Sequence, residues 1–169
     1  MKELKSTNLT DLDYMRLALL EAQKASRHDE VPIGAIVVLD GRIIAHATNK
    51  RRKGDILGHA EVIALKKASR RLRDWRLQDC DLYVTLEPCA MCVGVAVNAR
   101  IRRIIFGAYD LNAGCCGSVI DLTKTFKLNH TVTVTSGIMQ EECSKLISLY
   151  FANKRKKAKS LDKKINKKI

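Results

Sequence analysis

The chain has 169 residues and a formal net charge of +13, and 46% of its residues are hydrophobic. This length and this apolar content fit one globular domain with a substantial core, and they argue against a mainly disordered chain. The longest uninterrupted apolar run, Ile33 to Leu39, is far too short to cross a bilayer, and the first residues lack the apolar core of a signal peptide. We therefore expect no membrane association and a cytoplasmic location, in which the six cysteines stay reduced.

Positive charge is concentrated at the carboxyl end of the chain. Residues 154–169 contain nine Lys or Arg and one Asp, so they carry +8 of the net charge of +13. Polyanions, nucleic acid above all, are the expected partners of such a chain, and a merely solubilising extension is the alternative. We divide the chain into a folded domain, residues 1–153, and a basic tail, residues 154–169.

The pattern of apolar residues and turn signals predicts helices and strands along the whole domain. Thr10 and Asp13 resemble a capping box, and they open a helix that ends near His28. Further elements are expected as strands at 33–39 and 42–48 joined by an Asp-Gly turn, a helix at 59–69, a strand at 82–86, a helix at 90–98, strands at 101–106 and 131–135, and a helix from 140 to about 151. The mixed segment 110–130 leaves room for a short helix after Ser118, and the tail either extends the last helix or frays.

This order of elements predicts an α/β fold, a three-layer α-β-α sandwich with one five-stranded mixed sheet. Helices separate the third, fourth and fifth strands, which favours right-handed parallel crossovers between them. We find no internal repeat and no linker that would divide the domain further.

Two short stretches carry the residue types from which zinc sites are built. His59 is followed 30 residues later by Cys89 and then by Cys92, and these three side chains would leave the fourth position of a tetrahedral ion for water. Both cysteines stand at the start of a predicted helix, where free N–H groups and the helix dipole lower thiol pKa values. Glu61 follows the histidine by two residues, so it can reach such a water and move its proton without binding the metal.

The specificity of this signal lies in the combination of motifs. C-x-x-C alone is also typical of structural zinc and of thiol redox sites. H-x-E followed by P-C-x-x-C resembles the signature of zinc-dependent nucleobase deaminases. The four remaining cysteines lack ligand spacing with a second histidine, so we interpret them as packing thiols; a second, structural zinc held through Cys115 and Cys116 is the less favoured alternative.

Beyond the metal motif, the chain closely resembles bacterial tRNA-specific adenosine deaminases across roughly residues 11–152. The resemblance rests on the segments VPIGA at 31–35, HAE at 59–61, YVTLEPCAMC at 83–92 and FGAYD at 106–110. It implies a cytidine-deaminase-like fold, one Zn²⁺ per subunit held by His59, Cys89 and Cys92, and a homodimer. It also implies conversion of the wobble adenosine of a tRNA anticodon loop to inosine by zinc-activated water, with Glu61 as the proton shuttle. We expect tRNA-Arg to be the substrate tRNA.

The same resemblance implies four substrate-binding residues. Asn49 matches a position that contacts the target nucleoside, and Asp110, Asn129 and His130 match positions near the bound anticodon loop. Each has a simpler alternative, since Asn49 can cap or turn its loop and Asp110 is a common turn residue. The basic run at 51–53 follows Asn49 directly and is placed to touch phosphate.

Two other functions stay open from the residues alone. A deaminase of guanine or of another free nucleobase or nucleoside could use the same metal site, although it would not need a basic surface. An RNA-binding module with a structural zinc would normally show a fourth protein ligand, and only three stand out here. The basic tail exceeds the usual end of the family, and we expect it to strengthen RNA binding without reading sequence, so that removing residues 154–169 weakens the salt dependence of binding.

Overall fold

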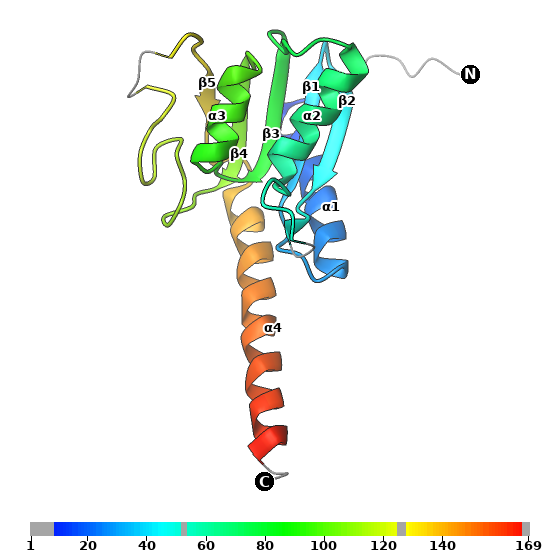
Figure 1. The fold of residues 1–169 in the computed structure, drawn as a ribbon, viewed down its shortest axis with the longest axis vertical. Coiled ribbons are helices and arrows are strands. Elements are labelled where there is room, and N and C mark those ends of the chain that lie inside the picture. The colour runs from blue at the N-terminus through cyan, green and yellow to red at the C-terminus, as the bar shows by residue number, and fades with distance from the viewer. Residues whose placement is uncertain (1–8, 52–53, 125–127, 167–169) are drawn as a thin grey trace, which may run out of the picture.

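The computed structural model describes residues 9–51, 54–124 and 128–166, and for residues 161–166 it describes the backbone alone. Its elements follow the predicted order along the chain (Figure 1). They are α1 (Asp11–Arg27), β1 (Gly34–Leu39), β2 (Arg42–Thr48), α2 (Ala60–Leu72), β3 (Cys80–Leu86), α3 (Ala90–Asn98), β4 (Arg103–Ala108), β5 (Thr133–Thr135) and α4 (Gln140–Asn166). The capping box expected at Thr10 and Asp13 is present at the start of α1.

The five strands form one mixed sheet in the order β2-β1-β3-β4-β5. β1 pairs antiparallel with both β2 and β3, whereas β3, β4 and β5 are parallel to one another. The predicted mixed sheet and the parallel relation of its last three strands are therefore confirmed. Because β3 and β4 run the same way, the loops that follow them meet at one edge of the sheet.

Helices cover both faces of the sheet and bury two apolar clusters against it. Along β1, Ala35 and Val37 point into the cluster under α2 and α3, and Ile36 and Val38 point into the cluster under α1 and the first turns of α4. This alternation is that of a strand buried on both faces, and it explains why the segment is apolar throughout. The three-layer architecture expected from the sequence is confirmed.

Three boundaries in the second half of the domain differ from the prediction. β4 begins at Arg103 rather than 101, because Arg100 has a φ of 60° and the Ile101 N–H still bonds to the carbonyl of Ala96 at the end of α3. Ile101 is apolar because it is buried, not because it lies in a strand. β5 is shortened to Thr133–Thr135. The described residues after Ser118 form turns and a bridge between Cys116 and Asp121, so a helix expected there is wrong for residues 118–124.

The last helix is the longest element of the structure. α4 runs for 27 residues, about 40 Å, and continues past the expected end near 151 as a rod that projects from the body (Figure 1). The tail thus extends the helix as far as Asn166, and the backbone passes through position 153/154 without a break. The division into domain and tail remains a prediction about function. Within the described residues, no helix combines the length and apolar content needed to span a bilayer.

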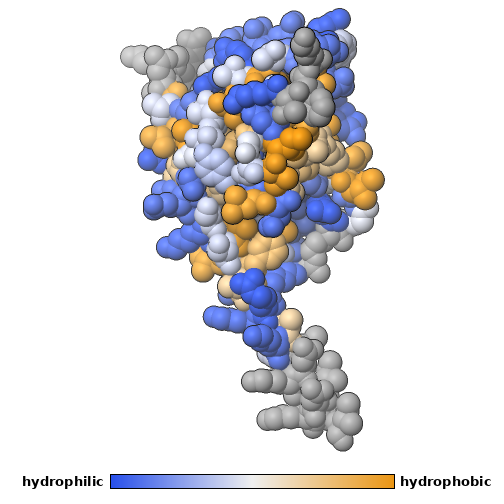
Figure 2. Space-filling model, turned by 90° about the vertical axis from the view of Figure 1, so that its left-hand side faces the viewer, coloured by the Kyte–Doolittle hydropathy of each residue, from blue (hydrophilic) through white to orange (hydrophobic). Residues whose placement is uncertain are grey.

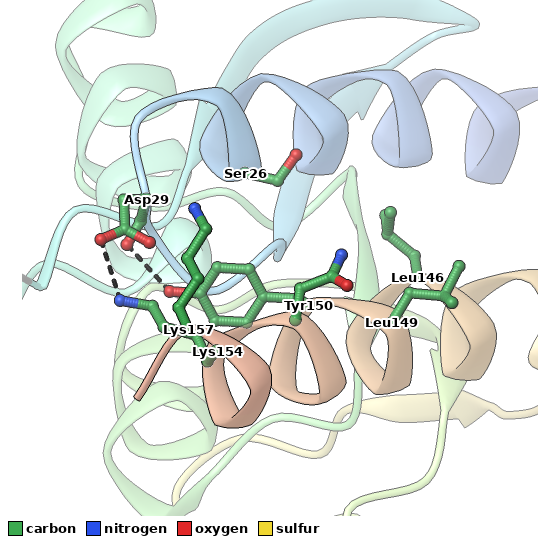
Figure 3. Close-up of a pocket in the computed structure, with 8 residues that line it drawn as sticks. Ser26, Asp29, Leu146, Leu149, Tyr150, Lys154 and Lys157 are labelled. Carbon is green, nitrogen blue, oxygen red and sulfur yellow. Dashed lines mark hydrogen bonds and ion pairs between the residues drawn. The ribbon is translucent and has the colours of Figure 1, made fainter. Parts of the chain in front are cut away.

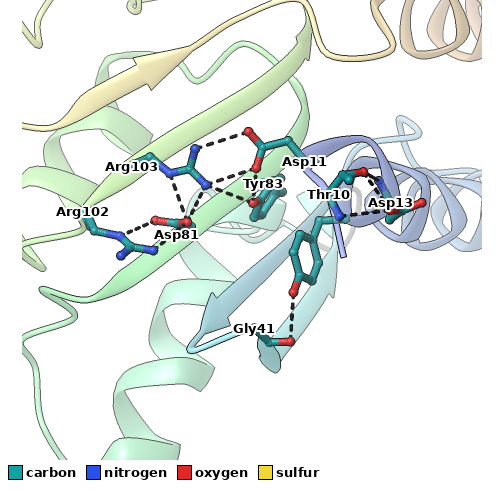
Figure 4. A network of polar contacts seen from close by, with 9 residues as sticks. Thr10, Asp11, Asp13, Gly41, Asp81, Tyr83, Arg102 and Arg103 are labelled. Atoms are coloured by element: carbon teal, nitrogen blue, oxygen red, sulfur yellow. Dashed lines mark hydrogen bonds and ion pairs between the residues drawn. The ribbon is translucent and has the colours of Figure 1, made fainter. Parts of the chain in front are cut away.

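A network of charged side chains fixes α1 to the amino ends of the parallel strands (Figure 4). Asp81 on β3 accepts hydrogen bonds from Arg102 at 2.8 Å and from Arg103 at 2.7 Å. Arg103 also donates to Asp11 at the start of α1, and the hydroxyl of Tyr83 donates to the same carboxylate. These contacts hold the end of the sheet that lies away from the metal-binding motifs.

Candidate active site

The three expected metal ligands converge at the carboxyl ends of the parallel strands. His59 is the N-cap of α2, Cys89 is the N-cap of α3, and Cys92 lies in the first turn of α3. The Nδ1 of His59 is 3.7 Å from the Sγ of Cys89 and 3.4 Å from the Sγ of Cys92, and the two sulfur atoms are 3.6 Å apart. Residues that stand 30 positions apart in the sequence therefore form one cluster.

The local chain paths explain how these side chains meet. Pro88 cannot donate to the sheet and ends β3, after which Cys89 opens α3. On the other side, the loop before α2 is closed by a hydrogen bond from the Lys50 N–H to the carbonyl of Gly58. A Cβ at Gly58 would lie 2.8 Å from the backbone carbonyl of Lys50, so only glycine lets the chain pass this closely and deliver His59 to the cluster.

The cluster fits a tetrahedral metal ion. Zinc bonds of about 2.1 Å to nitrogen and 2.3 Å to sulfur require donor atoms to lie roughly 3.6 to 3.8 Å apart. The three observed separations, 3.4 to 3.7 Å, are close to these values. Among the described residues, His59, Cys89 and Cys92 are the group of histidine, cysteine and acidic side chains whose donor atoms could hold an ion. Thiolate and imidazole are the donors that zinc prefers.

Glu61 lies beside the cluster as a buried acid. Only 4% of the residue is exposed, and its Oε2 has no hydrogen-bond partner among the residues that the structure describes. Burial raises the pKa of Glu61 to about 7. A buried carboxyl oxygen without a partner is costly, so its retention next to a ligand cluster points to a role in chemistry rather than in folding.

The two thiols are coupled to each other, and the acidity of each depends on its neighbour. The hydrogen bond with Cys92, together with backbone N–H groups at the start of α3, lowers the pKa of Cys89 to about 5. The pKa of Cys92 is instead raised, first by its hydrogen bond with Cys89 and then by burial. The backbone N–H groups at the start of α3 thus act on Cys89 in the predicted direction, whereas the sulfur of Cys92, one turn later, is more enclosed.

A pocket of about 560 Å³ opens over the cluster. His59, Glu61 and Cys89 form its floor. Its walls come from the segment before β1, the segment after β2, the start of the segment after β4, and α4. They include Val31, Ile33, Asn49, Arg51, residues 109–113, Ile147 and Phe151. A volume of this size suits a nucleobase with part of its ribose.

α4 reaches this pocket because it is anchored to the loop after α1 (Figure 3). The hydroxyl of Tyr150 donates a 2.8 Å hydrogen bond to the carbonyl of Asp29, and the Nζ of Lys154 donates to the Asp29 carboxylate at 2.8 Å. This junction borders a smaller cavity of about 260 Å³. Tyr150 and Lys154 hold one side of α4, and the neighbouring side carries Ile147 and Phe151 to the pocket.

The structure brings two of the four predicted substrate residues to the pocket. Asn49 is 2% exposed and lines it, and Asp110 lines it as well. The side chain of Asp110 also accepts hydrogen bonds from the N–H groups of Asn112 and Ala113. Asp110 therefore also stabilises a turn, which was the simpler alternative from the sequence. Of the basic run at 51–53, Arg51 lines the pocket, and residues 52 and 53 lie outside the described residues.

Asn129 and His130 lie elsewhere in this chain. The carbonyl of Asn129 accepts a hydrogen bond from Arg100, and the ring of His130 bonds at 2.7 Å to the carbonyl of Ile101. Both contacts are made beyond the carboxyl end of α3, whereas the metal ligands are at its amino end. The structure therefore does not place these two residues in the pocket of their own chain.

Sequence reasoning misses several residues at the site, among them Ile147, Phe151 and Glu87. Ile147 and Phe151 look like part of an amphipathic packing face, and their i, i+4 spacing alone cannot tell a core face from a pocket wall. Glu87 stands in the Glu-Pro-Cys motif with no role of its own assigned, yet it is a buried pocket residue that is 2% exposed. An acid directly before the metal-binding motif is the signal that could have identified it.

The remaining cysteines pack in the core, as expected. All six cysteines of the chain are free thiols. Cys115 and Cys116 belong to the apolar cluster under α2 and α3, and burial raises the pKa of Cys116 to about 12. Neither joins a metal-binding group among the described residues, so the structure gives no support to a second zinc.

Fold and site together define the class of this protein: a deaminase with a His-Cys-Cys metal site at the carboxyl ends of a mixed sheet. A family model described as MafB19-like deaminase matches residues 9–147. Over 154 residues the chain is 42% identical to the tRNA-specific adenosine deaminase of Bacillus subtilis (strain 168), an alignment that covers 90% of this chain and 96% of the relative.

Two solved structures extend the comparison. One, from a study of A-to-I editing by tRNA:A34 deaminases at the wobble position of transfer RNA, has a TM-score of 0.76 and 42% identity, and the match covers 79% of this chain and 97% of the other. A guanine deaminase from Bacillus subtilis has a TM-score of 0.57 and 34% identity, and the match covers 60% of this chain and 66% of the other. The chain belongs to the tRNA-specific adenosine deaminases, within the MafB19-like deaminases.

Proposed function

We propose that this protein hydrolyses the wobble adenosine of a tRNA anticodon loop to inosine. Water adds its oxygen to C6 of the adenine, and the exocyclic amine leaves as ammonia. The observation that carries this proposal is the buried carboxyl group of Glu61, which has an oxygen without a partner among the described residues, beside three converging ligands at the floor of a nucleoside-sized pocket. Family membership supports the choice of adenosine in tRNA as the substrate.

His59, Cys89 and Cys92 are the residues that would hold one Zn²⁺ per subunit. When bound, the ion supplies Lewis acidity that makes a water molecule nucleophilic at neutral pH. Glu61 is placed to take a proton from the attacking water, to pass it to N1 of the adenine, and later to protonate the departing amine. Glu61 is buried at this pocket, and polar contacts are stronger in such a site than in bulk water.

The walls of the pocket are suited to a base turned out of an RNA loop. We propose that Asn49, which is buried at the pocket, hydrogen-bonds the nucleoside, and that Asp110 helps to frame the loop. Tyr109 and Phe151 are 43% and 42% exposed at the same pocket and offer aromatic faces for stacking. Arg51 adds a cation at its edge for phosphate.

A free-base substrate such as guanine explains the surface less well. A small neutral base gains nothing from a chain of net charge +13, whereas an RNA backbone does. The solved guanine deaminase is also matched over a smaller part of its length than the tRNA:A34 deaminase structure. We therefore propose an anticodon stem-loop, with tRNA-Arg as the first isoacceptor to test, and the cytoplasm as the place of action.

We propose a homodimer on the basis of an apolar surface. Figure 2 shows apolar groups gathered on the face that carries α3 and the segment after β4. Exposed apolar residues of that segment are Leu111, Val119, Ile120 and Leu128, whose exposed fractions range from 39% to 80%. A second copy seated here would cover this surface. It would also offer a route by which Asn129 and His130 could act at the site of the neighbouring subunit.

The projecting part of α4 is proposed as an electrostatic RNA contact. The described side chains of the tail, residues 154–160, include five Lys or Arg, and residues 155–160 are exposed. Phe151 lines the pocket on the same helix, so the basic extension starts directly beside the site. Contacts of this kind add affinity and salt dependence without sequence preference.

The decisive experiment compares substrates on the purified zinc-loaded protein. Inosine should form in a tRNA-Arg anticodon stem-loop with adenosine at the wobble position, and a stem-loop with guanosine there should be inert. Free adenosine, guanine and cytosine are assayed in parallel as the alternative substrates. Turnover of guanine without turnover of the stem-loop would overturn the proposal, and metal analysis of the same sample should find one zinc per chain.

A further inference from the structure

The carboxylate of Glu87 is enclosed by hydrogen-bond donors from a single later segment of the chain. Its Oε1 accepts from the N–H groups of Cys116 at 2.9 Å and Ser118 at 3.0 Å. Its Oε2 accepts from the N–H of Asp110 at 3.1 Å and from the hydroxyl of Ser118. The side chain thus gathers three backbone N–H groups and one hydroxyl in a site that is 2% exposed.

These donors all belong to the segment 110–118, which follows β4 and lies outside the named helices and strands. Backbone groups buried without partners are costly, so the carboxylate gives this segment its shape. Gly114 fits the same arrangement, since a Cβ built there would overlap the carboxyl group of Glu87. Glu87 is therefore the side chain that binds the N–H groups of Asp110, Cys116 and Ser118 together.

The same segment touches both halves of the active site. Residues 109–113 form a wall of the pocket. The N–H of Cys115 bonds to the carbonyl of Pro88 at 2.8 Å, and Gly114 forms a β-bridge with the metal ligand Cys89. Glu87 itself stands two residues before that ligand, at the end of β3. The carboxylate of Glu87 thus links the end of β3, which leads to the metal ligands, to the pocket wall formed by residues 109–113.

A role in the proton transfers does not fit this geometry. Each oxygen of the Glu87 carboxylate already accepts two hydrogen bonds, whereas Glu61 has an oxygen at the floor of the pocket without a partner in the described part of the chain. A fully engaged, buried carboxylate is suited to hold a loop in place, and its charge strengthens each of these hydrogen bonds.

We propose that Glu87 is a positioning residue of the deamination reaction, which fixes the wall 109–113 relative to the metal ligands and thereby sets how the nucleobase is held. The inference rests on the proposed function for its kinetic consequences. It places Glu87 outside the reacting atoms, so the loss should fall mainly on substrate binding, with kcat changed less than KM.

The test uses two substitutions that disturb the same contact from opposite sides. Glu87→Gln keeps the shape, but its amide directs N–H donors where one carboxylate oxygen accepted, which leaves the Asp110 N–H facing a donor. Gly114→Ala keeps Glu87 and pushes the segment away from it. We expect each to raise KM for the stem-loop about tenfold or more, with a smaller fall in kcat and with zinc retained at one per chain.

A control and a rescue separate positioning from general stability. Ser118→Ala removes only the hydroxyl contact and keeps the three backbone bonds, so its KM should change by less than about threefold. In Glu87→Ala the deleted side chain leaves room for a small carboxylate, and added formate should lower KM towards the wild-type value. The free energy of unfolding of every variant is measured by urea denaturation beside the kinetics.

The outcomes are separable. A lower free energy of unfolding with unchanged KM in Glu87→Gln and Gly114→Ala would reduce Glu87 to a structural residue and overturn the proposal. If the wild-type protein does not deaminate the stem-loop at all, the proposed function fails instead. Amide hydrogen exchange of Asp110, Cys116 and Ser118 then tests the positioning directly, and unchanged exchange in Glu87→Gln would overturn it.

Discussion

The hydroxyl of Tyr150 donates a 2.8 Å hydrogen bond to the backbone carbonyl of Asp29, which ties the last helix to the loop after the first. Phe151 is the next residue and lines the pocket, so this contact controls where the aromatic side chain stands. Tyr150→Phe removes the hydroxyl alone. We expect KM for the stem-loop to rise about 3- to 10-fold, the cost of one neutral hydrogen bond, with kcat nearly unchanged.

Steady-state kinetics on the stem-loop checks this, with Ser148→Ala as the matched control. Ser148 is exposed on the same helix and takes no part in the hydrogen bonds that anchor α4 to Asp29. A control that raised KM as much as Tyr150→Phe would show that α4 tolerates no change at all, which would remove the special role of the anchor.

Glu61 is expected to be essential to the chemistry and dispensable for metal binding. Glu61→Gln keeps the size of the side chain but cannot accept and return a proton. We expect kcat to fall by at least about 10²-fold, with zinc still bound at one per chain. Inosine formation measured by nucleoside mass spectrometry, together with metal analysis, tests both parts. An RNA-binding module with a structural zinc would lose nothing in this experiment.

Removal of one ligand should separate the metal site from the other thiols. Cys89→Ala deletes a ligand whose sulfur lies 3.7 Å from the Nδ1 of His59. Zinc content and inosine formation should then fall together. Cys143→Ala also deletes a buried free thiol, but on the opposite face of the sheet, and it should keep zinc and at least about a third of the activity. Equal zinc content in the two variants would contradict the assigned ligand set.

Local patterns predict the fold and the ligands well because each depends on neighbours in sequence. The Asp-Gly turn sets the pairing of β1 with β2, and the H-x-E and P-C-x-x-C motifs each sit at a helix start that the chain itself encodes. Glu87 could not be assigned this way, since its donors come from 23 to 31 residues later in the chain. Its role exists only once the segment after β4 has returned to β3.

The same distinction explains the other misses. Ile101 is apolar in a position where a strand is expected. Its N–H, however, donates a hydrogen bond to the carbonyl of Ala96 at the end of α3, so the residue lies outside β4. His130 is close in sequence to β5, but its ring bonds to the carbonyl of Ile101, away from the pocket. The sequence pattern indicates whether a residue is buried or polar. Only the tertiary structure shows which residues are its neighbours.

The basic extension of α4 should raise the salt dependence of RNA binding. A chain that ends at Lys157 keeps the anchor between Lys154 and Asp29 and removes the five lysines at 159, 163, 164, 167 and 168. The slope of log K against log salt should become shallower by roughly 0.7 to 0.9 for each phosphate that the shortened chain no longer neutralises. Fluorescence anisotropy between low and moderate salt measures it.

A full-length variant with the same five lysines changed to glutamine is the matched control for length. It should reproduce the shallower slope, since charge rather than helix length is the cause. An unchanged slope in both proteins would assign the tail to solubility alone, which is the alternative left open by the sequence.

Acid should weaken the network at the amino ends of the parallel strands. Burial opposes ionisation of Asp81, but hydrogen bonds and charge from Arg102 and Arg103 outweigh it and hold the pKa of this carboxyl below its usual value. A carboxyl whose pKa is lower in the folded than in the unfolded state stabilises the fold fully above the unfolded value of about 3.9. That contribution is lost as pH falls through the folded value. Asp81→Asn removes it at every pH.

We therefore expect Asp81→Asn to lower the free energy of unfolding by about 1 to 3 kcal/mol at pH 7. The difference from the wild-type protein should shrink steadily below about pH 4, because the unfolded wild-type chain then binds a proton at Asp81 that the folded protein binds only at still lower pH. Urea denaturation at pH 7, 5, 4 and 3 measures this. Asp74→Asn is the control, since Asp74 is exposed, its ion pair with Arg76 is 3.8 Å long, and an amide oxygen can still accept the 2.9 Å hydrogen bond from the Arg76 N–H. It should change the free energy of unfolding by less than about 0.5 kcal/mol. A constant difference between Asp81→Asn and wild type down to pH 3 would show that packing, not the charge of Asp81, holds α1 to the sheet.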